Sequence, residues 1–217
     1  MAEINLLDTL PTTKRDVNAR AQQKTAEDRA LAKQFGRDFF DGERRHGYGG
    51  YRYDGRWLPV ARRMVEHYGL PANARILDVG AAKGFLMHDF LQVLPQATVR
   101  GIDVSEYARD NAYGTMRDLI DIGSADRLPY ENASFDLVVS INSIHNLPLD
   151  RCKQSLREIQ RVTRAHAFIT VDAWHTDDER RRLVDWVLTA ETYMSVTDWQ
   201  RIFAEVGYLG DCWWFIP

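Results

Sequence analysis

Short apolar runs alternate along this chain with longer stretches in which apolar residues recur at helical spacing. The runs lie at residues 76–79, 99–103, 119–123, 134–142 and 167–172. Most of them are followed by a segment whose apolar positions return every third or fourth residue, as on the buried face of a helix. Short buried strands that alternate with helices predict a parallel sheet covered by helices, with a ligand at the carboxyl ends of the strands.

The first run is the most informative, because it ends in a turn of small residues and opens into a helix. The turn contains Gly80, Ala81, Ala82 and Gly84, and Phe85 begins the helical spacing. Small residues let a ligand approach the backbone, and the exposed N–H groups at the start of a helix favour a polar or anionic ligand. The turn is therefore a candidate cofactor site, although taken alone it could equally be a tight strand-to-helix connection.

The spacing around this turn separates two kinds of cofactor. The dinucleotide fingerprint G-x-G-x-x-G is not met, because Phe85 stands where its third glycine belongs. Asp103 ends the next apolar run, roughly 20 residues on, where a carboxylate can take both hydroxyls of a ribose. The arrangement resembles the first two motifs of the class I S-adenosylmethionine (SAM) methyltransferases. Their first motif reads acidic-x-G-x-G-x-G and is matched by Asp78, Gly80, Ala82 and Gly84, with Ala82 in place of the central glycine.

Two further motifs extend the resemblance to residues 123–130 and 134–142. They imply that Asp126 accepts a hydrogen bond from the adenine amino group and that the backbone of Ala125 and Asp126 lies against the base. Asp136, at the entry of an apolar strand, is instead expected to be a structural carboxylate. The cofactor-binding set implied by the resemblance is Asp78, Gly80, Ala82, Gly84, Phe85, Asp103, Val104, Ala125, Asp126, Ser140 and Tyr53.

The run at 134–142 ends in polar residues, where the family usually places side chains that face the transferring methyl group. We select Asn142 and His145 here, and Tyr51 upstream, as candidate catalytic residues. His145 could act as a general base, because the unperturbed pKa of histidine lies near neutrality. It could equally only orient a loop, since methyl transfer often needs position more than proton abstraction. Trp174 and His175 are further acceptor-pocket candidates, although Trp174 could also belong to the core.

Residues 39–57 differ in composition from the rest of the chain, because they combine glycines with tyrosines and arginines. The glycines give turns and hinges, and the aromatic and arginine side chains stack and hydrogen-bond. We predict that this segment, the cover, lies over the active site and supplies part of the methionine and acceptor pockets. The alternative is a packed loop whose tyrosines cover the sheet edge. Residues 1–36 are expected to form a charged helix or a partly disordered arm.

Composition narrows the function classes. The 217 residues carry 28 Lys plus Arg against 31 Asp plus Glu, a formal net charge of −3, so we expect no nucleic-acid partner. The only cysteines, Cys152 and Cys212, argue against a disulfide framework, and the histidine spacing predicts no metal. No apolar run approaches membrane-spanning length and the N-terminus is polar, so we expect a soluble, cytoplasmic protein with no membrane partner.

The resemblance implies an α/β fold, a three-layer αβα sandwich around a seven-stranded, mostly parallel sheet whose strand seven is antiparallel. We divide the chain into an N-terminal helical arm and cover, residues 1–57, and a SAM-binding domain, residues 58–217. The expected function is transfer of a methyl group from SAM to a small molecule, by analogy a saccharide or natural-product intermediate in a bacterium, with S-adenosylhomocysteine as product. We expect a monomer or homodimer. Alternatives are a non-catalytic SAM-binding regulator and a protein or RNA methyltransferase that depends on a partner.

Overall fold

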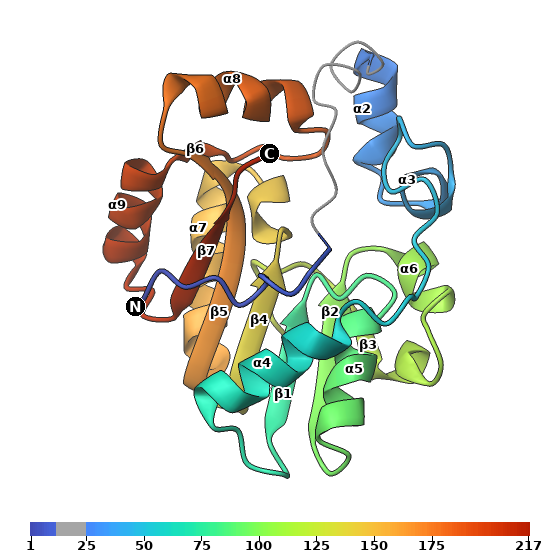
Figure 1. Ribbon diagram of the computed structural model, residues 1–217, viewed down its shortest axis with the longest axis vertical. Coiled ribbons are helices and arrows are strands. Elements are labelled where there is room, and N and C mark those ends of the chain that lie inside the picture. The colour runs from blue at the N-terminus through green and yellow to red at the C-terminus, as the bar shows by residue number, and fades with distance from the viewer. Residues whose placement is uncertain (12–24) are drawn as a thin grey trace.

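The computed structural model describes residues 1–11 and 25–217, so the central part of the predicted arm, residues 12–24, lies outside the described residues. Strands β3, β2, β1, β4 and β5 follow one another across a sheet, and β6 and β7 both pair with β5 (Figure 1). The described strands are β1 (Arg75–Val79), β2 (Thr98–Asp103), β3 (Ile120–Ile122), β4 (Phe135–Ile141), β5 (Thr163–Trp174), β6 (Met194–Ser195) and β7 (Asp211–Phe215).

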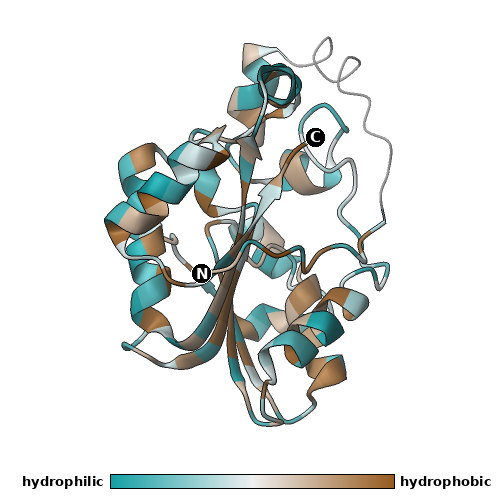
Figure 2. Cartoon of the chain, turned by 60° about the vertical axis from the view of Figure 1, so that its left-hand side comes forward, coloured by the Kyte–Doolittle hydropathy of each residue, from teal (hydrophilic) through white to brown (hydrophobic). Residues whose placement is uncertain are grey.

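Helices cover both faces of this sheet. One core joins the sheet to α4 (Leu58–Tyr68) and α5 (Phe85–Val93), and the other joins it to α7 (Leu149–Val162) and α9 (Val196–Val206). Figure 2 shows hydrophobic residues concentrated along the sheet and polar ones on the outer sides of the helices. The remaining helices are α2 (Ala26–Ala32), α3 (Arg37–Asp41), α6 (Glu106–Asp110), α8 (Asp177–Trp186) and the 3₁₀ turns η1 (Met116–Leu119) and η2 (Ile144–Asn146). The predicted three-layer sandwich is confirmed.

Local sequence explains most of these elements. Helix α4 ends at Gly69, whose φ of 57° is one that glycine adopts without strain. Ser105 and Ser195 accept hydrogen bonds from the first turns of α6 and α9, as N-cap residues do. Strand β4 is buried along nearly its whole length, as expected of a central parallel strand. None of the helices in the described residues is long and apolar enough to cross a bilayer.

The predicted antiparallel direction of strand seven is wrong. Strand β7 runs parallel to β5, with Phe168 opposite Asp211 and Asp172 opposite Phe215. The cause is the connection, because α9 follows the short strand β6 and carries the chain back to the amino edge of the sheet. A strand that begins there must run parallel to its neighbour, whereas an antiparallel strand would need a hairpin turn.

Residues 2–6 run along the outer edge of β7 and then enter the core. The Ile4 amide donates to the Cys212 carbonyl, and the Cys212 amide donates to the Ala2 carbonyl, each at 3.0 Å. Leu6 is fully buried among residues of α4, α5 and the sheet. The domain division at residue 57 stays a prediction, but this part of the first segment packs inside the second.

Asp136 has the structural place expected of it. One carboxylate oxygen accepts from the Arg75 amide at 2.8 Å, and the other accepts from the Arg164 guanidinium. Both partners lie at the amino edge of the sheet, because Arg75 begins β1 and Arg164 lies in the second position of β5. The side chain therefore joins strands at the edge opposite the ligand crevice.

We expect Leu6→Ala to lower the free energy of unfolding by about 2–5 kcal/mol, because it removes a fully buried side chain and leaves a cavity. Leu209→Ala is the matched control, since Leu209 is 70% exposed and its truncation should change stability by no more than about 0.5 kcal/mol. Urea unfolding of both variants measures the difference. Equal stabilities would mean that residues 2–6 do not pack on the core in solution.

Candidate functional site

The turn between β1 and α5 has left-handed backbone at three positions. The φ angles are 85° at Gly80, 50° at Ala82 and 73° at Gly84. A Cβ atom at Gly80 would lie 2.0 Å from Ser143 Oγ, and one at Gly84 would lie 2.7 Å from Met116 Cβ. Both glycines are therefore required by the protein's own packing, in addition to any ligand. Ala82 holds a conformation that is costly for an L-residue, which is typical of functional sites.

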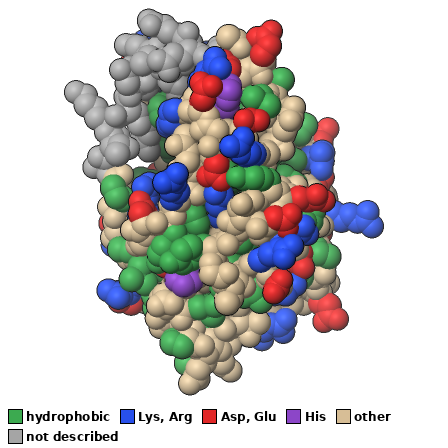
Figure 3. Space-filling view, turned by 90° about the vertical axis from the view of Figure 1, so that its right-hand side faces the viewer, with side chains coloured by type: hydrophobic (Ala, Val, Ile, Leu, Met, Phe, Trp, Pro, Cys, Tyr) green, Lys and Arg blue, Asp and Glu red, His purple; other side chains and the backbone are tan. Residues whose placement is uncertain are grey.

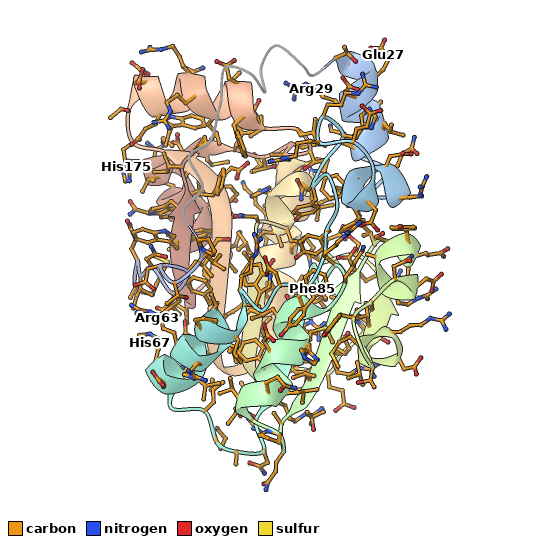
Figure 4. All side chains as sticks on the ribbon, turned by 45° about the vertical axis from the view of Figure 1, so that its right-hand side comes forward. Glu27, Arg29, Arg63, His67, Phe85 and His175 are labelled. Carbon is orange, nitrogen blue, oxygen red and sulfur yellow. The ribbon has the colours of Figure 1, made fainter. Side chains whose placement is uncertain are left out.

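Most amides of this turn are not free to meet a ligand. The Gly80 amide donates to the Ile102 carbonyl at 2.8 Å, the Ala82 amide to Asp103 Oδ2 at 2.7 Å and the Gly84 amide to the Ala81 carbonyl at 2.8 Å. The prediction of exposed amides concerns the start of α5, beyond these bonded positions. Phe85 begins that helix near the middle of the molecule (Figure 4) and lines a cavity.

Two cavities meet at the carboxyl ends of β1 and β4, where the order of the strands reverses. Their volumes are about 440 and 580 Å³, within the usual range for small-molecule sites. The first is lined by Asp103 and Ala125, among others, and is called the β2 cavity here. The second is lined by Asp78 and Phe85, among others, and is called the β1 cavity. Gly80, Ala82 and Asn142 line both, so one extended ligand can occupy the two together.

Most of the predicted site residues are brought together on these walls. The β2 cavity is lined by Asp103, Val104, Ala125 and His145, the β1 cavity by Tyr51, Asp78 and Phe85, and both by Gly80, Ala82 and Asn142. Four predicted residues are not among the lining residues of either cavity: Tyr53, Gly84, Asp126 and Ser140.

These four side chains have partners or surroundings of their own. Asp126 accepts from the Arg151 guanidinium at 2.6 Å, and the Tyr53 hydroxyl donates to Asp89 at 2.6 Å. Ser140 is fully buried within β4, and Gly84 faces the Met116 side chain. For Asp126 to contact adenine, its carboxylate would have to accept from adenine and Arg151 together, or its ion pair with Arg151 would have to break.

Two carboxylates stand at the ends of neighbouring strands beside the turn. Asp103 accepts from the amides of Ala82 and Ser105, at 2.7 and 2.9 Å. Burial raises the pKa of Asp103, although these amides favour its charged form. Burial, together with the nearby charge of Asp103, raises the pKa of Asp78 to about 7. A positively charged ligand in the β1 cavity would favour ionisation of Asp78.

Polar groups at the ends of β4 and β5 form a second cluster. Asn142 has a φ of 50°, and its side-chain oxygen accepts from Thr170 Oγ1 at 2.8 Å. His145 is buried, and its Nδ1 accepts from the Asp172 amide at 3.1 Å, while its Nε2 lies 3.8 Å from Asp172 Oδ2. Burial lowers the pKa of His145, although the charge of Asp172 opposes this. His145 therefore joins the loop after β4 to β5, and its role as base or as loop anchor stays a prediction.

The cover contacts this turn through an ion pair whose lysine is buried and whose aspartate is partly exposed. Lys83 Nζ lies 2.6 Å from Asp41 Oδ2 and donates to the Tyr51 carbonyl at 3.0 Å. Asp41 also accepts from the Tyr107 hydroxyl at 2.7 Å and from the Tyr51 amide at 3.1 Å. The Tyr51 ring stacks on Phe85 with centroids 4.6 Å apart. The cover thus rests on the turn through both polar and aromatic contacts.

The N-terminal helices reach the other side of the β2 cavity. Arg29 of α2 donates to the Val187 carbonyl at 3.0 Å, and Lys33 pairs with Glu191 at 2.8 Å. Figure 4 shows Arg29 on α2, above the end of the sheet that carries the cavities.

Acidic and basic side chains are interspersed on the face drawn in Figure 3.

Sequence reasoning missed several lining residues. Arg44 and Arg56 of the cover, Asp172 at the end of β5, Trp186 and Phe215 all line a cavity. Asp172 could have been found, because it is an acidic residue after an apolar run, the same signal that marked Asp103. Trp174 and His175, the further acceptor-pocket candidates, line neither cavity. Trp174 packs against Tyr193, and the His175 amide donates to Glu179.

Fold and site together define a class. A strand–turn–helix unit, a carboxylate that ends the neighbouring strand and a crevice at the β1/β4 reversal form the arrangement of the Rossmann-like, SAM-dependent methyltransferases. Residues 77–171 match the methyltransferase domain family. Residues 77–171 are therefore similar to the class I SAM methyltransferases, and SAM is the cofactor of that family.

Individual relatives agree with this assignment. A malonyl-(acyl-carrier protein) O-methyltransferase of Geobacter sulfurreducens is 37% identical over 91 residues, which cover 40% of this chain and 34% of that protein. Methyltransferase GfsG of Streptomyces halstedii is 34% identical over 112 residues, 48% of this chain and 39% of that protein. The YcgJ protein from Bacillus subtilis has a similar fold, with a TM-score of 0.53 and 20% identity over 70% of this chain and 68% of its own. The matched region thus spans well under half of both named methyltransferases.

We expect Asp103→Ala to weaken SAM binding at least tenfold, because loss of a carboxylate that accepts such hydrogen bonds costs about 1.5–3 kcal/mol. Asp121→Ala is the control: Asp121 lies on the adjacent strand β3, pairs with Arg100 at 2.7 Å and lines neither cavity. Calorimetric titration of SAM into both variants gives the comparison. Unchanged affinity in folded Asp103→Ala would remove Asp103 from the site.

A second prediction follows from the pKa of Asp78, about 7 in the folded protein and about 3.9 in the unfolded chain. Between these values the folded state binds a proton that the unfolded state has lost, so stability falls as the pH rises through this window. In the ligand-free protein, we expect the effect of Asp78→Asn on the free energy of unfolding to be more favourable at pH 8 than at pH 4, by up to about 4 kcal/mol. We also expect this substitution to weaken SAM binding. Denaturation at both pH values measures this; a pH-independent difference would place Asp78 in a solvated, ordinary environment.

Proposed function

We propose that this protein is an enzyme that transfers a methyl group from SAM to a small-molecule acceptor. The observation that carries the proposal is the joint wall of the two cavities, where Asp103, Asp78 and the small-residue turn meet the polar ends of β4 and β5. This donor set suits SAM, because Asp103 can take the ribose hydroxyls and Asp78 can balance positive charge. When bound, SAM supplies an electrophilic methyl group on a sulfonium.

The chain's own residues would bind and orient the reactants. Val104 is 51% exposed on the wall of the β2 cavity and can lie against the adenine face, as can the backbone at Ala125. Asn142, fixed by Thr170, is positioned at the meeting point of the cavities. Displacement at the methyl carbon depends on alignment more than on any one group, and a fixed side chain at that point favours alignment.

The cover supports a small acceptor. It lies over the turn through the Lys83–Asp41 pair, and its Arg44, Tyr48 and Arg56 line the cavities. On the far side, α2 is held to the segment after α8 by the Arg29 and Lys33 contacts. A site enclosed from both sides suits a metabolite better than a folded macromolecule. A saccharide or natural-product intermediate remains our proposal for its class.

The test is a transfer assay with methyl-labelled SAM against two fractions of a cell extract, small metabolites and macromolecules. We expect labelled product in the metabolite fraction with the wild-type protein and at least tenfold less with Asp103→Ala at a subsaturating SAM concentration. Calorimetry establishes SAM binding in parallel. Binding without any labelled product would support a regulatory protein, and label only in the macromolecular fraction would support the partner-dependent alternative.

A further inference from the structure

We propose that Asp172 is the general base that takes a proton from the acceptor, that His145 positions it, and that the acceptor group is a hydroxyl. The inference rests on the proposed methyl transfer and names the chemistry of its acceptor. Asp172 ends the register of β5 with β7 and lines the β2 cavity, at the edge of the sheet where the two cavities meet.

Asp172 is a buried carboxylate with little compensation for its charge. Its side chain is 9% exposed, and within the described residues no hydrogen bond to its carboxylate oxygens is found. Its backbone is fully used, because the amide donates to His145 Nδ1 and the carbonyl accepts from the Trp199 indole at 2.9 Å. Buried carboxylates normally have donors, so one left without them beside a cavity suits a proton-accepting role.

The hydrogen bonding of His145 assigns the direction of proton transfer. Because Nδ1 accepts from an amide, a neutral imidazole carries its proton on Nε2, which faces Asp172 Oδ2 at 3.8 Å. Neither nitrogen of His145 is then available as the base, whereas its N–H points at the carboxylate. The His145 carbonyl also accepts from the amides of Glu191 and Thr192, which fixes the whole residue. His145 is therefore the positioning residue and Asp172 the base.

Among the described residues, few charged side chains surround Asp172. Burial raises its pKa, and His145 acts in the opposite direction. Of the packed elements, β7 brings Phe215 and α9 brings the Trp199 indole, while β4 is followed by uncharged Asn142. Helix α8 directs Arg180 over the Trp174 ring and Glu179 to the His175 amide. Among the described residues, the other charged side chains on the cavity wall are Arg44, Arg56 and Asp103.

The role of Asp172 indicates which group the acceptor presents. A buried base is useful only for a group that still holds its proton at neutral pH. A hydroxyl fits this requirement, whereas a carboxylic acid is already ionised.

The step balances as follows. The acceptor O–H bond breaks and its proton passes to an Asp172 oxygen. The freed oxygen pair forms the new O–CH₃ bond, and the electron pair of the S–CH₃ bond leaves with sulfur, which yields neutral S-adenosylhomocysteine. The protonated carboxyl then returns its proton to solvent through the open part of the cavity.

The experiment compares Asp172→Asn with the wild type, using the acceptor isolated by the labelled-SAM screen. We expect SAM affinity within about threefold, kcat at least about 100-fold lower, and loss of the rise of kcat with pH that marks ionisation of the base. Asp136→Asn is the matched control, since it removes a buried carboxylate at the opposite edge of the sheet and should keep the wild-type pH profile. His145→Leu should move the rising limb to higher pH, because a group that favours the carboxylate is lost, and His145→Gln should restore it in part.

Two readouts do not depend on turnover rate. Carbon-13 NMR of the Asp172 carboxyl, in protein saturated with S-adenosylhomocysteine, should give a pKa above that of an exposed aspartate. The labelled product should resist mild alkali, as an ether does. A wild-type pH profile in Asp172→Asn, or an alkali-labile methyl ester, would overturn the assignment. If the wild type yields no product although it binds SAM, the proposed function fails and the base fails with it.

Discussion

The ion pair between Lys83 and Asp41 holds the two halves of the site together. Lys83 is 7% exposed and belongs to the turn after β1, while Asp41 ends α3, 42 residues earlier. Although burial opposes ionisation of Asp41, hydrogen bonds from Lys83 and Tyr107 keep its pKa below the ordinary value. Removal of Asp41 would leave the buried Lys83 ammonium without its carboxylate partner, which is destabilising. The position of Tyr51 over Phe85, and with it the wall of the β1 cavity, depends on this contact.

The features that sequence could predict are those fixed by neighbouring residues. The strand at 76–79, the turn at Gly80 and the carboxylate Asp103 all follow from patterns less than about 25 residues long. The features it could not predict depend on contacts between distant segments. The direction of β7 depends on α9 crossing back over the sheet, and the partner of Tyr53 is Asp89, on a helix that the cover had to meet in space. Asp126 likewise lined up with the family motif, but Arg151 holds its carboxylate.

The site concentrates negative charge at one edge of the sheet. Asp78, Asp103 and Asp172 belong to the ends of β1, β2 and β5, and burial raises the pKa of each. Such an edge is unfavourable for the empty protein, because three carboxyls lose solvation there. The cost at Asp78 and Asp103 falls when a cation with hydroxyl groups enters, so part of the binding energy of a sulfonium nucleoside serves to neutralise a cost already present in the fold.

The contacts of residues 2–6 constrain the order of folding events. The Ala2 amide donates to the carboxylate of Asp211, which lies 209 positions later in the chain, and Leu6 completes the packing over α4 and α5. A contact of such sequence separation has a large loop-closure entropy and cannot form before β7 has left the ribosome. Docking of residues 2–6 is a late folding step, and a chain arrested before β7 would expose the edge of β5 to other strands.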